Sequence, residues 1–130
     1  MKYLLFFLLL TASSAYAGEL SLTPYLHMQD ALSKDQMEIA LSHHQIICEK
    51  NKAELKHSYS DCDKKFTGIS DLRKSFKTLS EVYLKKGNKS ELNGLMKVSC
   101  PMAKAKWVQK EGKIANPYYG KSMLECGEKI

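Results

Sequence analysis

The stretch SDLRKSFKTLSEVYLKK, residues 70–86, predicts the strongest helix of the chain. Its large apolar residues, Leu72, Phe76, Leu79 and Tyr83, follow one another at steps of three and four, so they share one face of an α-helix. Lysines at positions 85 and 86 suit the negative end of the helix dipole, and the Gly-Asn pair at 87–88 ends the helix.

The flanking sequence continues the helical pattern. A short helix is expected over residues 24–32, with Pro24 at its start, and a longer one over residues 34–57, with Ser33 and Gln36 as its capping box. A further helix is expected from Ser90, carrying Leu92, Leu95 and Met96, and a last short one around Ala103 and Trp107. The sequence therefore predicts an all-α fold: a small antiparallel helical bundle with an irregular C-terminal loop lobe from Gly112 onward.

The N-terminus predicts export. Lys2 precedes an apolar run at residues 3–10, and Ala15-Tyr16-Ala17 is typical of a signal-peptidase site. We expect residues 1–17 to be a signal peptide and residues 18–130 to form a single helical-bundle domain. The expected location is the periplasm, in soluble form and without stable membrane insertion, because no later segment is apolar enough to span a bilayer.

The charge pattern excludes some classes of function. The formal net charge of +6 comes almost entirely from scattered lysines, with Arg73 as the only arginine. Nucleic-acid binding is not expected, because surfaces that read bases and clamp phosphates favour arginine. The chain also has no Cys-x-x-Cys motif, no glycine-rich phosphate loop and no recognised nucleophile turn, so we do not expect an enzyme.

The four cysteines suit an oxidising compartment. They allow two disulfides in three connectivities, of which Cys48–Cys62 with Cys100–Cys126 is the simplest. His44 lies four residues before Cys48, a spacing that a metal ion can bridge, but its place on the apolar stripe favours a structural histidine beside a Cys48–Cys62 disulfide.

Soft ligands gather in the last third of the chain. Cys100, Met102, Met123 and Cys126 offer thiol and thioether groups, which select Cu(I) over harder cations. The residues expected to shape such a site are Pro101, Trp107, Asn116, Pro117, Tyr118, Tyr119 and Gly120. The same segment is equally compatible with a Cys100–Cys126 disulfide that staples the loop, and the sequence leaves both readings open.

Several of these motifs resemble those of a small exported bacterial domain of unknown function. The resemblance rests on Cys100-Pro-Met-Ala, Trp107, Asn116-Pro-Tyr-Tyr-Gly and Met123-Leu-x-Cys-Gly, and more weakly on Asp35 and the Arg73-x-x-Phe-x-x-Leu-Ser motif. That domain also occurs fused to periplasmic adaptor subunits of copper/silver efflux systems of the resistance-nodulation-division type. The resemblance implies a helical bundle and a role close to heavy-metal handling.

Together these observations predict a periplasmic protein that binds Cu(I), or another soft ion, with Cys100 and Cys126 as principal ligands and Met102 and Met123 in support. Its partner would be a periplasmic efflux adaptor or another metal-handling protein. The rival prediction is a metal-free interaction module that docks a partner through its aromatic C-terminal loop. The roles of His27, His43 and His44 stay open at this stage.

Overall fold

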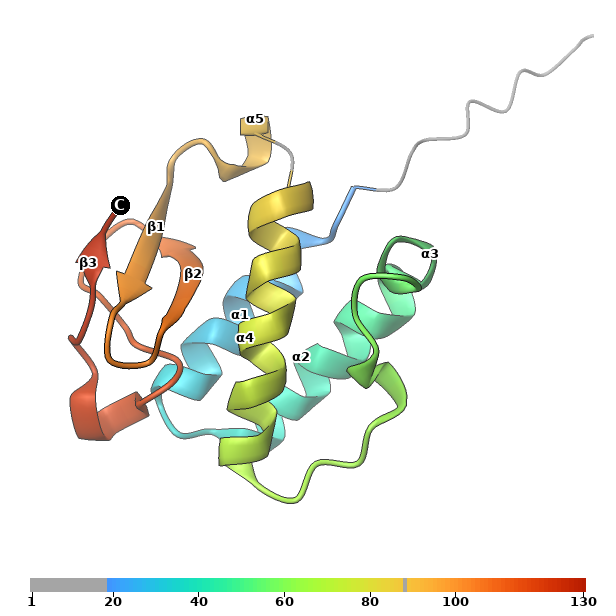
Figure 1. Cartoon of the computed structure of the whole chain (residues 1–130), viewed down its shortest axis with the longest axis horizontal. Coiled ribbons are helices and arrows are strands. Elements are labelled where there is room, and N and C mark those ends of the chain that lie inside the picture. Colours follow the sequence, from blue (N-terminus) through green and yellow to red (C-terminus); the bar gives the residue numbers. More distant parts are fainter. Residues whose placement is uncertain (1–18, 88) are drawn as a thin grey trace, which may run out of the picture.

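Three helices form the main body of the molecule (Figure 1). The computed structural model describes residues 19–87 and 89–130, so the predicted signal peptide, residues 1–17, lies outside the described residues. The helices are α1 (Leu22–Ser33), α2 (Met37–Lys50) and α4 (Ile69–Lys86), and a one-turn helix α3 (Lys52–Leu55) follows α2.

The helix predicted over residues 70–86 is confirmed as α4. All four residues of its apolar face are buried among the other elements. Full burial of a side chain of this size stabilises the fold by about 1.5–3 kcal/mol, so this face is a main source of stability. The helix ends at Gly87, whose N–H donates to the carbonyl of Tyr83.

The helix predicted over residues 34–57 is shorter in the structure, because the chain turns at Asn51. This side chain is buried, its Nδ2 donates to the Ile47 carbonyl, and its Oδ1 accepts a hydrogen bond from the Ser21 N–H. The capping box was also wrong: Ser33 is the last residue of α1 and its Oγ donates back to the Asp30 carbonyl.

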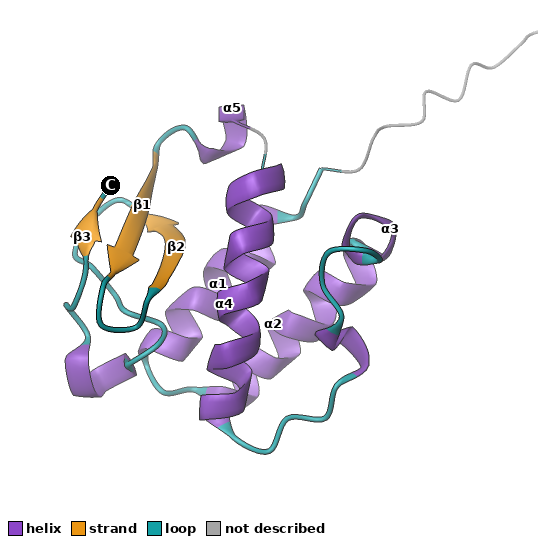
Figure 2. Ribbon diagram, viewed as in Figure 1, coloured by secondary structure: helices purple, strands orange, loops and turns teal. Residues whose placement is uncertain are grey.

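The all-α prediction is wrong, because the C-terminal third contains an antiparallel sheet (Figure 2). Its strands are β1 (Leu95–Cys100), β2 (Ala105–Lys110) and β3 (Glu128–Lys129), in the order β2-β1-β3. The helix expected from Ser90 is only one turn, α5 (Lys89–Leu92), and the helix expected around Trp107 is strand β2. Short 3-10 turns, η1 (Asp61–Asp63) and η2 (Gly120–Met123), complete the elements.

Alternation of buried and exposed residues explains strand β1. In β1 the side chains of Met96, Val98 and Cys100 are buried, while the residue between each pair is more exposed. This period of two is the mark of a strand with one face on a core. Residues 101–104 form the tight turn to β2, in which the Lys104 N–H donates to the Pro101 carbonyl at 3.1 Å.

Strand β2 packs against α1 and α4, so the sheet covers one side of the helical layer (Figures 1 and 2). One hydroxyl joins these three elements. Tyr25 of α1 is fully buried, its OH shares a hydrogen bond with Ser80 Oγ of α4, and it accepts one from the Val108 N–H of β2. None of the helices within residues 19–87 and 89–130 is long and apolar enough to cross a membrane.

Candidate functional site

The structure brings Cys100 and Cys126 together. Their Sγ atoms lie 3.3 Å apart, which is shorter than an ordinary van der Waals contact between two sulfurs. The distance is too long for a disulfide bond, and both cysteines are free. Cys100 is the last residue of β1 and is fully buried, whereas Cys126 is half-buried and lies between η2 and β3. The hydrogen bond with the Cys100 thiol raises the pKa of Cys126, so this sulfur carries a proton at neutral pH.

Gly127 allows the Cys126 sulfur to come close to the Cys100 sulfur. It has a φ of +144°, and a Cβ at this position would come within 3.0 Å of the Trp107 ring and of a Val98 methyl group. The backbone after Cys126 therefore lies directly on the sheet. A side chain at position 127 would lift that backbone, and with it the Cys126 sulfur, away from Cys100.

Asn116 organises the loop that faces the thiols. It is fully buried, its Oδ1 accepts hydrogen bonds from the N–H groups of Tyr118 and Tyr119, and its Nδ2 donates to the Cys126 carbonyl at 2.7 Å. Its own N–H donates to the Leu124 carbonyl. One side chain thus fixes both the start of the loop and the backbone of one cysteine.

Arg73 and Asp35 attach this loop to the helices. From α4, Arg73 donates from Nε to the Pro117 carbonyl at 2.8 Å and from Nη2 to the Leu32 carbonyl and the Asp35 carboxylate. The guanidinium hydrogen bond holds the pKa of Asp35 below its usual value. Gly120 lies against both groups, so these two residues, which the sequence offered only through a resemblance, position the loop.

The aromatic residues occupy different depths. Trp107 is a core residue: it is fully buried, and its Nε1 donates to Gln109 Oε1 at 2.9 Å. Tyr118 packs edge-on against it and donates from its OH to the Lys106 carbonyl. Gln109 was missed by the sequence reasoning, although it also accepts the Ala115 N–H and donates to the Lys113 carbonyl.

The two methionines differ in their exposure to solvent. Met102, in the turn after Pro101, is 63% exposed, and Met123 is half-buried at the end of η2. The backbone links Met123 to the thiol pair, because the Cys126 N–H donates to the Met123 carbonyl. Within the described part of the chain, no three His, Cys, Asp or Glu side chains gather in an arrangement for a metal ion.

The predicted disulfide is confirmed. Cys48 of α2 and Cys62 of η1 are joined, which is typical of a protein in an oxidising compartment. Next to it, His44 is buried, and its Nε2 shares a hydrogen bond with Tyr59 OH, which in turn bonds to Ser75 Oγ. Burial lowers the pKa of His44, as expected for a structural histidine.

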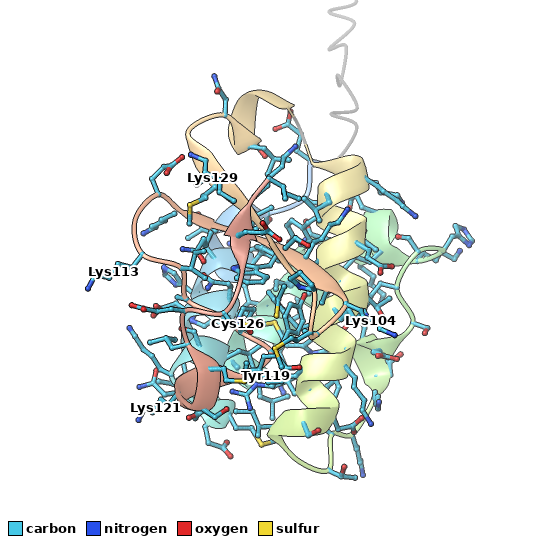
Figure 3. The ribbon with its side chains drawn as sticks, turned by 60° about the vertical axis from the view of Figure 1, so that its left-hand side comes forward. Lys104, Lys113, Tyr119, Lys121, Cys126 and Lys129 are labelled. Atoms are coloured by element: carbon cyan, nitrogen blue, oxygen red, sulfur yellow. A yellow bond between two sulfur atoms is a disulfide. The ribbon has the colours of Figure 1, made fainter. Side chains whose placement is uncertain are left out.

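Lysines surround the thiol region. Residues 95–130 contain seven lysines and three glutamates. Figure 3 shows Lys104, Lys113, Lys121 and Lys129 distributed around Cys126 and Tyr119. Among the described residues, Lys129 pairs with Glu111, while no ion pair involves the other three. This face of the C-terminal lobe is therefore positively charged.

Comparisons of the chain with protein families, with curated proteins and with solved structures found no match.

Proposed function

We propose that this protein is an exported, periplasmic soft-metal binder that holds Cu(I) between Cys100 and Cys126. The observation that carries the proposal is the 3.3 Å separation of their sulfurs, one fixed in strand β1 and the other in a loop. Thiolate sulfur selects Cu(I), and Cu(I) is stable with as few as two such ligands.

The sulfur pair must open to admit the ion. Two metal–sulfur bonds of about 2.3 Å place the sulfurs about 3.7 Å apart at a tetrahedral angle, with the thioethers as further ligands, and about 4.6 Å apart when two thiolates alone hold Cu(I) in a linear arrangement, so the pair must open by roughly 0.5–1.3 Å. Cys100 is held by the β1–β2 pairing, whereas Cys126 belongs to no helix or strand. Cys126 is therefore the sulfur that moves and, being half-buried, the one that meets an incoming ion first.

The expected compartment and the resemblance to a known domain both support copper binding. Two adjacent thiols in an oxidising compartment persist only when something protects them, and a bound soft metal does so. The Cys48–Cys62 disulfide and the predicted signal peptide favour the periplasm. The CPMA, NPYYG and MLECG segments resemble those of a domain that also occurs fused to copper/silver efflux adaptors.

The charged face suggests what kind of partner would exchange the metal. Lys104, Lys113 and Lys121 suit an acidic protein surface, and charge complementarity of this kind accelerates encounter. An efflux adaptor or another metal-handling protein with such a surface would approach Cys126 from this side. Ligand exchange would then begin at Cys126 and finish at the buried Cys100.

A second function is favoured by one specific observation. At 3.3 Å the sulfurs are closer than a metal would hold them, so oxidation to a Cys100–Cys126 disulfide needs little rearrangement. In that state the chain is a stapled interaction module, and the loop at residues 116–120 would dock a protein partner through its aromatic side chains.

Anaerobic native mass spectrometry of the mature protein with Cu(I) tests both functions. We expect one copper per chain, with one disulfide and two free thiols, and no tightly bound copper in Cys100→Ser or Cys126→Ser. A Cys48→Ser/Cys62→Ser variant is the control and should still bind one copper. Circular dichroism shows whether each variant keeps its helices.

Two results would overturn the copper assignment. If both single serine variants bind copper as well as the parent protein, the ligands are wrong. If protein isolated from the periplasm carries two disulfides and no metal, the stapled interaction module is the function to pursue.

A further inference from the structure

A second pair of potential metal ligands lies away from the cysteines, where α1 meets α2. His27 of α1 and His43 of α2 place their ring centroids 4.9 Å apart, with an angle of 82° between the rings. His27 is exposed and His43 is half-buried, so solvent reaches the pair. Neither residue takes part in the thiol site or in the core hydrogen-bond chain of His44.

One atom of this pair lacks a partner. Nδ1 of His43 is buried and is the only buried side-chain nitrogen or oxygen of the described residues without a hydrogen bond. Buried polar atoms in folded proteins are almost always hydrogen-bonded or bound to an ion, and leaving one unsatisfied costs about 1–3 kcal/mol. The pair is therefore incomplete as it stands.

A shared metal ion would complete it. Imidazole nitrogens lie about 2.0–2.1 Å from a bound divalent ion, so two rings on one ion have centroids about 4.5–5.2 Å apart for bond angles between 90° and tetrahedral. The observed 4.9 Å falls inside this range. The arrangement of α1 and α2 thus places the two rings at a separation that binding one ion requires.

We propose that His27 and His43 bind a divalent transition-metal ion, Cu²⁺ in preference to Zn²⁺. Imidazole suits both ions, and the order of affinities of nitrogen ligands favours Cu²⁺. No third His, Cys, Asp or Glu joins a group with these two within the described residues, so water fills the remaining positions.

Such a site differs from the thiol pair in what it selects. Two histidines and water favour the oxidised, harder ion, whereas two thiols favour Cu(I). Because the ligands are few and one of them, His27, is exposed, binding is expected to be exchangeable. The inference stands independently of copper binding at Cys100 and Cys126.

The test uses the Cys100→Ser/Cys126→Ser protein, which removes the thiol site and its reaction with Cu²⁺. Isothermal titration with Cu²⁺ and with Zn²⁺ gives stoichiometry and affinity, and electron paramagnetic resonance reports nitrogen ligands on Cu²⁺. We expect one Cu²⁺ per chain with two imidazole nitrogens, and weaker binding of Zn²⁺. His27→Gln and His43→Gln should each weaken Cu²⁺ binding at least tenfold.

The exposed His57 supplies the matched control, and His57→Gln should leave binding unchanged. The proposal is overturned if His27→Gln binds Cu²⁺ as tightly as the His57→Gln control, or if the spectrum shows no imidazole nitrogen. Should His43→Gln fail to fold, His27→Gln decides alone, because its side chain is exposed.

Discussion

Asp35 and Gly120 lie in such close contact that no side chain fits at position 120. A Cβ there would overlap the Asp35 carboxylate and the Arg73 guanidinium, and Gly120 also has a φ of +59°. The two residues are 85 positions apart in sequence, yet the Lys121 N–H donates to the same carboxylate. This contact ties the turn between α1 and α2 to the loop beside the thiols.

Gly120→Ala should therefore destabilise the protein. A left-handed backbone costs an L-residue roughly 1–2 kcal/mol, and the overlap with Asp35 adds about 1–3 kcal/mol. Urea unfolding measures the loss. Gly94→Ala is the matched control, since Gly94 has a φ of +86° with open space around it and pays only the backbone cost. Equal losses in both variants would show that the contact with Asp35 is unimportant.

Asn116→Ala should lower the free energy of unfolding by about 3 kcal/mol, because two N–H donors and the Cys126 carbonyl lose their partner in a buried setting. It should also weaken Cu(I) binding, since the Cys126 backbone is no longer fixed. The exposed Asn93 is the control, and Asn93→Ala should change stability by less than about 0.5 kcal/mol. Indistinguishable behaviour of the two variants would refute the organising role of Asn116.

How far the sequence predicted the fold depends on the segment. The face of α4 has one interpretation, because Leu72, Phe76, Leu79 and Tyr83 fit only a helical period. At residues 92–96 the apolar spacing of Leu92, Leu95 and Met96 fits a helix as well as the start of a strand. The strand prevails because β1 gains a partner strand and a core face, neither of which is visible in a short window.

The sequence predicted only that part of the candidate site that can be read from residue types, and not the part that depends on tertiary packing. Cys100 and Cys126 were paired by chemistry, and the structure brings them together. Gln109 gave no signal, because a glutamine between Val108 and Lys110 is ordinary in an exposed strand and only tertiary packing buries it. The contact of His27 with His43 likewise depends on how α1 packs on α2.

The two methionines should differ in their effect on Cu(I) binding. Met123→Leu should weaken binding several-fold, since Met123 is half-buried and its backbone carbonyl accepts the Cys126 N–H, so the residue belongs to the same turn as Cys126. Met102→Leu should have a smaller effect, because that side chain is 63% exposed. Leucine preserves volume and removes only the sulfur. Competition with a Cu(I) chelator measures both, and a larger effect at Met102 would reverse this ranking.

The free energy of unfolding should fall as the pH drops below about 6.5, which is the usual pKa of a histidine side chain in an unfolded chain. Burial lowers the pKa of His44 in the folded state, so the unfolded chain binds the proton more readily and acid favours unfolding. His43 acts in the same direction, because burial and then His27 lower its pKa. Urea unfolding at a series of pH values on both sides of about 6.5 measures how the free energy of unfolding depends on pH. This dependence should be shallower in His44→Gln, and an unchanged dependence would exclude His44 as one of its causes.

Cu(I) affinity should rise with pH. The Cys100 thiol raises the pKa of Cys126, and a thiol must lose its proton to bind the metal, so protons compete with copper throughout the neutral range. Each proton released on binding lowers the apparent dissociation constant by about tenfold per pH unit, so the release of two protons gives a fall of up to about 100-fold per pH unit. Chelator competition between about pH 6 and pH 8 measures this slope in the parent and in the Cys48→Ser/Cys62→Ser control. An affinity independent of pH would mean that thioethers, rather than these two thiols, hold the metal.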